Sequence, residues 1–418
     1  MWPRTAFVQA WGKLLTHDIL LASRRSKATF TYCDSASDYL GVCETSASDF
    51  RAHIGSRSGV AKYGSSSIAS THCFTSDFFL SDLKRRNLIV NSHPPFHHDL
   101  DNHASSSANL QQISALPNVL YAGFDPTADS LHIGHLLIVS NLIRSSIFGC
   151  HPIALIGRAT AMIGDPSGRN EERNQLSPDE VCENSKNVLK QLAEILENSQ
   201  SYLGEKAHLT ILNNLDWYEK TPVIDFLRMA KTVRIGDMLR LGPVKSRLEK
   251  ADSVAFLSML AKKHSCYFQL GGSDQHGNIQ SGSDYISSQE KHFSAGLCFP
   301  LLTDKNGCKL GKSTMATLHD DVAEKFLLYM SQRRLDEIEA IIQEHRQNLG
   351  KWVAQTYLAD EMTKLVHGRS GFEMASTCSD ILFRGCLEDL EKLNSETISS
   401  LFGPASTLVI PKVKKVPL

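Results

Sequence analysis

The sequence lacks the features of a membrane-spanning or disulfide-stabilised protein. None of its apolar runs reaches the roughly 18 residues that a helix needs to cross a bilayer. Its ten cysteines are scattered from Cys33 to Cys386 without a CxxC pair, which argues against a disulfide scaffold or a zinc module and for reduced thiols. Its formal net charge is only −1, so overall charge does not indicate a nucleic-acid-binding protein.

The composition indicates a globular chain with room for two or three domains. The chain has 418 residues, of which 42% are hydrophobic and 21% charged, as in ordinary folded domains. Local charge is more informative than net charge. Between Pro222 and His264 lie nine Lys or Arg against four acidic residues. Such a patch suits RNA phosphates, but a solvated helical face has the same composition.

The beginning of the chain is basic and poor in acidic residues. The first 30 residues contain one acidic residue, Asp18, against five basic ones: Arg4, Lys13, Arg24, Arg25 and Lys27. This bias is typical of an organellar transit peptide. The following residues, to about Ser76, are rich in Ser and Ala and have no sustained periodicity. We predict a transit peptide and disordered extension over 1–78; an unprocessed extension is the alternative.

The next part of the chain alternates predicted strands with helices. Val119–Phe124, Pro152–Gly157 and Tyr267–Gly272 are short apolar runs suited to buried strands, and such alternation favours a parallel sheet. After Leu318 the pattern is helical over Val322–Gln343 and Trp352–Val366, with Gly368 as a C-cap. We predict an α/β fold, with a Rossmann-like parallel-sheet domain over 79–318, an all-helical domain over 319–402 and a short basic tail over 403–418.

One motif places two histidines in the first turn of a predicted helix. The segment from Asp125 to His135 reads DPTADSLHIGH and follows a predicted strand. His132 and His135 are three residues apart, so they share a helix face. A helix N-terminus binds phosphate through its free N–H groups, and Gly134 leaves room for a ligand to approach the backbone. A metal pair is the alternative interpretation, although no third ligand lies nearby in sequence.

A second motif, KLGKS, runs from Lys309 to Ser313 after a polar turn. Lys309, Lys312 and the hydroxyl of Ser313 on a glycine-containing loop can close over a triphosphate and stabilise departing pyrophosphate. Alone, this pattern is usually a solvated turn. It becomes informative because it follows the HIGH motif in the same chain.

HIGH followed by a KMSKS-like loop resembles the class I aminoacyl-tRNA synthetases. The longer sequence from about Ser81 to about Phe402 resembles the tyrosyl enzyme of this class. The matching blocks are YAGFDPTADSLHIGH, ALIGRATAMIGDPSGRNEER, NNLDW, VKSRLE, FQLGGSDQHGN, PLLTDKNGCKLGKS and LADEMTKLVHG. The resemblance implies a tyrosine–tRNA ligase whose helical domain binds the anticodon side of tRNA(Tyr). It also implies ATP as substrate with Mg²⁺ accompanying it, L-tyrosine as the second substrate, a homodimer, no membrane association and no dedicated metal site. With the basic N-terminal segment, it implies a location in the mitochondrial matrix.

The same resemblance assigns roles to individual residues. Tyr121 and Asp165 would hold the phenolic hydroxyl, Asn214 would line that pocket, and Gln275 would approach the carboxylate. Adenosine would contact Gly123, Asp125, Gly134, Gly272 and Asp274. His132 and His135 would bind the phosphates of the transition state. Pyrophosphate would be covered by Arg169, Arg173, Lys309, Lys312 and Ser313. The tyrosine carboxylate is itself the nucleophile, so the protein has to supply alignment and charge stabilisation.

The chain departs from the family where a helix reading approximately Tyr-x-x-x-Gln-x-x-Asp binds the substrate ammonium group. Here Glu249 is followed by KADSVAFLSMLAKKHSCYFQ, which is shorter and lacks that trio. Two further gaps are an aromatic-rich segment after Asp321 and a terminal RNA-binding module. Arg158 stands where the family usually has glycine, and His276 stands where it usually has an apolar or aromatic residue. A catalytically impaired RNA-binding paralogue, or a shortened isoform, is therefore the second hypothesis, and a related nucleotidyltransferase with a HIGH motif is the third.

Overall fold

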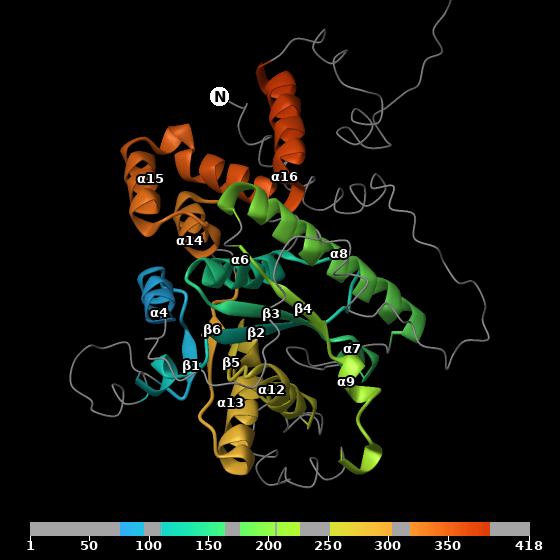
Figure 1. Cartoon of the computed structure of the whole chain (residues 1–418). Helices are drawn as coiled ribbons and strands as arrows, with labels where there is room; N and C mark the ends of the chain where they lie inside the picture. Colours follow the sequence, from blue (N-terminus) through green and yellow to red (C-terminus); the bar gives the residue numbers. More distant parts are fainter. Residues whose placement is uncertain are drawn as a thin grey trace, which may run out of the picture. The chain divides into compact units, whose positions relative to one another are not determined.

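A six-stranded sheet forms the centre of the structure (Figure 1). In this computed structural model the described residues are 76–95, 109, 111–163, 176–204, 207–225, 251–302 and 318–384. The strands are β1 (Asn91–His93), β2 (Val119–Phe124), β3 (His151–Ile156), β4 (Thr210–Asn213), β5 (Phe268–Gly272) and β6 (Ala295–Phe299). Their order across the sheet is β1-β6-β5-β2-β3-β4, and only β1 pairs antiparallel. The predicted α/β fold with a mainly parallel sheet is confirmed.

The strands bury both faces, as a parallel sheet covered by helices requires. Alternate residues of a strand point to opposite faces. On β2, Leu120, Ala122 and Phe124 join one core cluster, whereas Tyr121 joins a second. The first face is covered by α6 (Ile133–Ile147) and α8 (Pro178–Leu203), and the second by α12 (Ala251–His264) and α13 (His276–Tyr285) (Figure 1).

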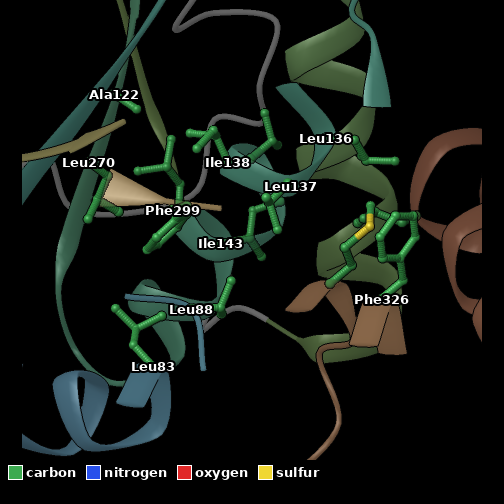
Figure 2. Packing of buried hydrophobic residues seen from close by; sticks show 14 of the residues in the cluster. Leu83, Leu88, Ala122, Leu136, Leu137, Ile138, Ile143, Leu270, Phe299 and Phe326 are labelled. Carbon is green, nitrogen blue, oxygen red and sulfur yellow. The ribbon is translucent and has the colours of Figure 1, made fainter. Parts of the chain in front are cut away.

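The large core cluster continues from the sheet into helices before and after it. Leu83 of α4 (Ser76–Arg85), Ile143 of α6 and Phe326 of α14 (Asp320–Met330) belong to the same cluster as Phe299 of β6 (Figure 2). Burial of such side chains stabilises a fold by about 1.5–3 kcal/mol each. The helical part therefore packs on α4 and α6 through apolar contacts.

The described residues after the sheet are helical. They form α14, α15 (Leu335–Gln347) and α16 (Val353–Arg384), with a short 3₁₀ turn, η5 (Leu349–Lys351). The predicted helical pattern over Val322–Gln343 is divided between α14 and α15, because the extended backbone of Ser331 (φ −63°, ψ 138°) ends α14. Within α16, Gly368 has φ +68°, as expected of the predicted C-cap, and the helix resumes beyond it. The boundary between the two predicted domains, the predicted segment 1–78 apart from its last residues, and the tail 403–418 lie beyond what the described residues test.

Candidate active site

The parallel strands end on a common edge, and most of the described candidate residues follow those ends. Asp125 follows β2, Asn214 follows β4, and η2 (Ser273–Gln275) follows β5. The strand order reverses at β2, because β3 and β4 extend the sheet on one side and β5 and β6 on the other. Ligands of open α/β sheets bind at the carboxyl ends beside such a reversal. The predicted adenosine contacts Gly123, Asp125, Gly272 and Asp274 belong to the two strand ends that flank it.

The histidine pair forms a reciprocal cap at the start of α6. His132 is the N-cap residue and has an extended backbone. Its Nδ1 accepts the backbone N–H of His135 at 3.2 Å, and the Nδ1 of His135 accepts the backbone N–H of His132 at 3.4 Å. The rings stack with centroids 3.6 Å apart. This is a capping box in which imidazoles replace the usual hydroxyl and carboxylate groups.

This cap determines where the imidazole protons are. A backbone N–H is always a donor, so each Nδ1 must carry a lone pair and each proton must sit on Nε2. Burial, and secondarily the neighbouring His132, lower the pKa of His135 to about 3. His135 is therefore neutral at physiological pH and offers Nε2–H as a hydrogen-bond donor.

Two backbone donors in the first turn of α6 stay open. The N–H groups of Ile133 and Gly134 have no acceptor within the described ranges, and the positive end of the helix dipole lies here. A phosphate would meet these N–H groups together with the two imidazoles. Gly134 has a local reason to be glycine, because an added Cβ would lie 3.0 Å from Cε1 of His132. The space that we expected Gly134 to leave for adenosine is thus partly filled by the His132 ring.

A buried polar chain connects the ends of β2, β3 and β4. Nδ2 of Asn214 lies 3.4 Å from Oγ1 of Thr160, and Oγ1 of Thr160 lies 2.9 Å from Oδ1 of Asp125. Oδ1 of Asn214 accepts the N–H of Ala159 at 2.8 Å in α7 (Arg158–Ile163). Gly157 is required here, because a Cβ would lie 1.8 Å from Oδ1 of Asp125. This series of hydrogen bonds fixes the Asp125 carboxylate at the sheet edge.

These hydrogen bonds show what the predicted residue Asn214 contacts, and they add Thr160 to the site. Asn214 is completely buried and its amide group is engaged with α7, so it supports the walls of the site, and direct contact with a substrate stays a prediction. Thr160 was not singled out from the sequence. Its signal was present in the block ALIGRATAMIGDPSG, where a hydroxyl sits three residues after a strand-ending glycine.

Tyr121 points to the face of the sheet opposite α6. It is 2% exposed and packs with Ile153, Trp217, Leu257 and other residues of the second core cluster. Burial, and secondarily Cys266, raise its pKa well above the usual range, so the phenol is neutral. The structure does not bring Tyr121 into contact with the histidines, because His135 packs edge-on against Phe124 on the other face. Tyr121 lies three residues before the end of β2, roughly 10 Å from the edge.

The end of β5 supplies a second set of polar groups. Asp274 is exposed, and a Cβ at Gly272 would lie 2.6 Å from its Oδ1. Oε1 of Gln275 accepts a hydrogen bond of 2.8 Å from Nδ2 of Asn278 in α13, which fixes the direction of the Gln275 amide. At β2, by contrast, Gly123 is exposed and an added Cβ would meet nothing within 4 Å. The backbone of β2 is therefore open to a ligand at this point.

Six predicted residues lie outside the described ranges, so the structure says nothing of their placement: Asp165, Arg169, Arg173, Lys309, Lys312 and Ser313. Arg158, where the resemblance leads one to expect glycine, is the first residue of α7. Its Nε is buried and has no hydrogen-bond partner among the described residues. The surrounding contacts give no structural reason for an arginine there.

Helix α12 occupies the sequence position where the ammonium-binding trio is missing. It runs from Ala251 to His264, and Leu257, Leu260 and Ala261 pack in the cluster that contains Tyr121. The buried hydroxyl of Ser258 donates a hydrogen bond of 2.5 Å to Oε1 of Glu290 in the π-helical turn η3 (Ile286–Glu290). The part of α12 that faces Tyr121 is therefore apolar and suits a phenol ring better than an ammonium group.

No group of three or more His, Cys, Asp or Glu within the described ranges is arranged to hold a metal ion. Among the described helices, none combines the length and apolar character needed to cross a membrane.

Comparison with known proteins supports the same family. The family model described as tRNA synthetases class I (W and Y) matches residues 114–324. The chain is 35% identical to the mitochondrial tyrosine–tRNA ligase of Drosophila melanogaster, over 78% of each chain. It is 37% identical to tyrosine–tRNA ligase 1 of Bacillus licheniformis, over 72% of this chain and 77% of the relative. The crystal structure of a C-terminally truncated Aspergillus nidulans mitochondrial tyrosyl-tRNA synthetase superposes with a TM-score of 0.62 at 28% identity, covering 73% of this chain and 94% of that one. The chain belongs to the tyrosyl-tRNA synthetase family of class I.

Proposed function

We propose that this chain activates L-tyrosine with ATP and transfers the tyrosyl group to tRNA(Tyr). The observation that carries the proposal is the neutral, mutually capped histidine pair at the N-terminus of α6, with two open N–H groups beside it. A site that offers hydrogen-bond donors to phosphate oxygens suits a reaction in which the substrate carboxylate attacks phosphorus.

In the first step, a carboxylate oxygen of tyrosine forms a bond to the α-phosphorus of ATP while the bond from that phosphorus to the β-bridging oxygen breaks. Pyrophosphate leaves with the electron pair. Nε2–H of His132 and His135 and the open N–H groups of α6 would donate to phosphate oxygens as charge develops. Mg²⁺ arrives with ATP. Arg169, Arg173, Lys309, Lys312 and Ser313 would cover the pyrophosphate.

The remaining residues would hold the two substrates. Gly123 and Asp125 at the end of β2 and Gly272 and Asp274 at the end of β5 would contact adenosine, together with the turn at Gly134. Tyr121 and Asp165 would hold the phenol, with Gln275 at the carboxylate end and Asn214 supporting the pocket wall. In the second step the terminal ribose hydroxyl of tRNA attacks the carbonyl carbon of tyrosyl-adenylate and AMP leaves.

A tyrosine-dependent ATP–pyrophosphate exchange assay tests the proposal. We expect exchange with tyrosine and not with phenylalanine, because a pocket built for the hydroxyl is left with unpaired polar groups when phenylalanine binds. We expect Tyr121→Phe to reduce the discrimination between the two amino acids. Absence of tyrosine-dependent exchange in the folded protein would contradict the activity.

The apolar face of α12 favours a second candidate function, an RNA-binding paralogue without ligase activity. The trio expected to bind ammonium is absent, and the described residues of α12 nearest Tyr121 are apolar. Tight binding of tRNA(Tyr) without exchange would support this candidate. Replacing the segment from Glu249 to His264 with the longer segment of a bacterial relative, and recovering exchange, would identify this helix as the cause.

We further propose that the protein acts in the mitochondrial matrix as a homodimer. The first 30 residues contain five basic residues and one acidic residue, as in transit peptides, and several similar proteins are mitochondrial tyrosine–tRNA ligases. Fusing residues 1–78 to a fluorescent protein tests the first point. Analytical ultracentrifugation of the purified chain tests the second.

A further inference from the structure

Four charged side chains are buried or nearly buried at the break between α14 and α15. Arg86 follows α4 and is 1% exposed, and Arg144 lies in the last turn of α6 and is 2% exposed. The side chain of Asp82 in α4 is 12% exposed, and Glu361 of α16 is 8% exposed. Buried charges occur where partners compensate the loss of hydration. Here the partners come from both sides of the junction between the α/β part and the helical part.

Both arginines donate to carbonyl groups at the C-terminus of α14 and in the turn that follows it. Arg86 donates to the oxygen of Leu328 in α14 at 2.9 Å and to that of Arg333 in the turn at 2.7 Å. Arg144 donates to the oxygens of Tyr329 at 3.1 Å and Ser331 at 2.5 Å. The last carbonyls of a helix lack intrahelical partners and lie at the negative end of its dipole. Two cations from the α/β part therefore cap the helix at which the continuous periodicity of the sequence is interrupted.

The helical part completes the charge balance. Oε2 of Glu361 accepts the hydroxyl of Ser331 at 2.7 Å, and its Oε1 accepts the N–H of Gln332 at 2.6 Å. Glu361 also lies 3.8 Å from Nε of the partly exposed Arg333. Burial, then Arg86, lower the pKa of Arg144 to about 9, and the carboxylates of Asp82 and Glu361 oppose that shift. One of these carboxylates comes from α4 and the other from α16, so both parts of the junction compensate the buried arginines.

Helix α6 connects this cluster to the candidate active site. Its first turn carries His132 and His135, and its last turn carries Arg144. The nine residues from His135 to Arg144 span roughly 14 Å of helix. The same helix is fixed to the junction by a second contact, in which Nε2 of Gln332 donates to the oxygen of Ser140 at 2.8 Å. The start of α6 thus carries the histidines proposed for tyrosine activation, and its end contacts the helices proposed to bind tRNA.

We infer that Arg86 and Arg144 are positioning residues for the transfer step: they hold helices α14–α16 in one register relative to α6, so that an RNA bound by those helices delivers its terminal ribose to the adenylate. This inference rests on the proposed function. The residues proposed for amino acid activation all belong to the α/β part, whereas transfer needs both parts in a fixed relation. Loss of the cluster should therefore separate the two half-reactions.

The experiment compares Arg144→Gln, Arg86→Gln and Arg144→Lys with unsubstituted protein. Arg346→Gln is the matched control, because the exposed Arg346 pairs with Glu324 within the same helices and, among the described residues, has no hydrogen bond or ion pair with α4 or α6. For the two glutamine variants we expect ATP–pyrophosphate exchange to be retained and kcat/KM for tRNA to fall about tenfold or more, the loss typical of a charge-assisted hydrogen bond. Arg144→Lys should recover part of the transfer activity, and Arg346→Gln should change neither step.

Hydrogen exchange of the full chain provides a readout that does not need catalysis. We expect faster exchange in Arg144→Gln at the N–H groups of Gln332 and Arg333 and in α14 and α15, with β2 and β3 unchanged. Equal losses in both half-reactions, or no change in either, would overturn the inference, as would unchanged exchange at the junction. Absence of pyrophosphate exchange in the unsubstituted protein would refute the proposed function instead. In that case tRNA affinity and hydrogen exchange decide the role of the cluster.

Discussion

Substitution of His135 by glutamine should change how stability depends on pH while preserving the helix cap. In the folded protein the pKa of His135 is about 3, whereas an unfolded histidine has a pKa near 6.5. Because the folded pKa is depressed, the unfolded chain binds the extra proton first as pH falls below 6.5. Stability is therefore complete above pH 6.5 and declines as the pH falls toward 3.

The magnitude follows from the two pKa values. Between pH 7 and pH 5 this one histidine should lower the free energy of unfolding by about 2 kcal/mol, close to 1.4 kcal/mol for each pH unit below 6.5. The His135 side chain is only partly buried, so water stabilises some of the charged form and this figure is an upper limit. Glutamine at the third helical position can accept the N–H of the N-cap residue as Nδ1 of His135 does, but it does not titrate.

Urea unfolding followed by tryptophan fluorescence at several pH values measures the effect. We expect His135→Gln to lose up to about 2 kcal/mol less than the unsubstituted protein between pH 7 and pH 5. The companion variant is His132→Asn, which retains an N-cap acceptor and removes the smaller cause of the shift. It should keep most of the pH dependence, because burial is the larger cause. Identical pH profiles for His135→Gln and the unsubstituted protein would refute the reasoning.

Three further substitutions test the sheet edge. Gly157→Ala should cost about 1–3 kcal/mol by overpacking and weaken ATP binding, because its Cβ would lie 1.8 Å from Oδ1 of Asp125; thermal unfolding and calorimetric titration with ATP measure the two effects. Gly123→Val should leave the unfolding midpoint unchanged or higher, since a Cβ there meets nothing within 4 Å, yet abolish ATP binding; retained affinity would contradict the predicted contact. Asn214→Ala should cost about 1–3 kcal/mol by leaving a buried N–H of α7 unpaired, as measured by the same urea titration.

The strands with the strongest apolar runs could be predicted from the sequence, and the others could not. Val119–Phe124 agrees with β2 at both ends. β4 has only four residues and β1 only three, so neither gives a periodic signal long enough to distinguish from a loop. The helical period over Val322–Gln343 reports which residues face the core. It does not report the carbonyls that Arg86 and Arg144 bind at the break.

The sequence was sufficient to identify candidate residues, but not to show the contacts that define their roles. Spacing alone put His132 and His135 on one face, and the structure confirms that they adjoin. The spacing could not reveal that each imidazole accepts a hydrogen bond from the other histidine's backbone N–H, because that contact depends on the extended backbone of the N-cap residue. Asn214 illustrates the opposite case. Its amide is used within the protein, a contact between segments more than fifty residues apart that no local pattern contains.

The glycines of the site bear on the choice between a ligase and an RNA-binding paralogue. An added Cβ at Gly157 would lie 1.8 Å from the Asp125 carboxylate, and one at Gly134 would lie 3.0 Å from the His132 ring, so contacts within the protein favour glycine at both positions. Gly123 has no such reason. It lies in a strand, where glycine costs roughly 0.5–1 kcal/mol relative to alanine, its φ is not positive, and a Cβ would meet no neighbouring atom. What a side chain at this position would obstruct is the space above β2, beside the reversal of strand order. A folded RNA-binding protein gains nothing from leaving that space open, whereas an enzyme that places a nucleotide there requires it.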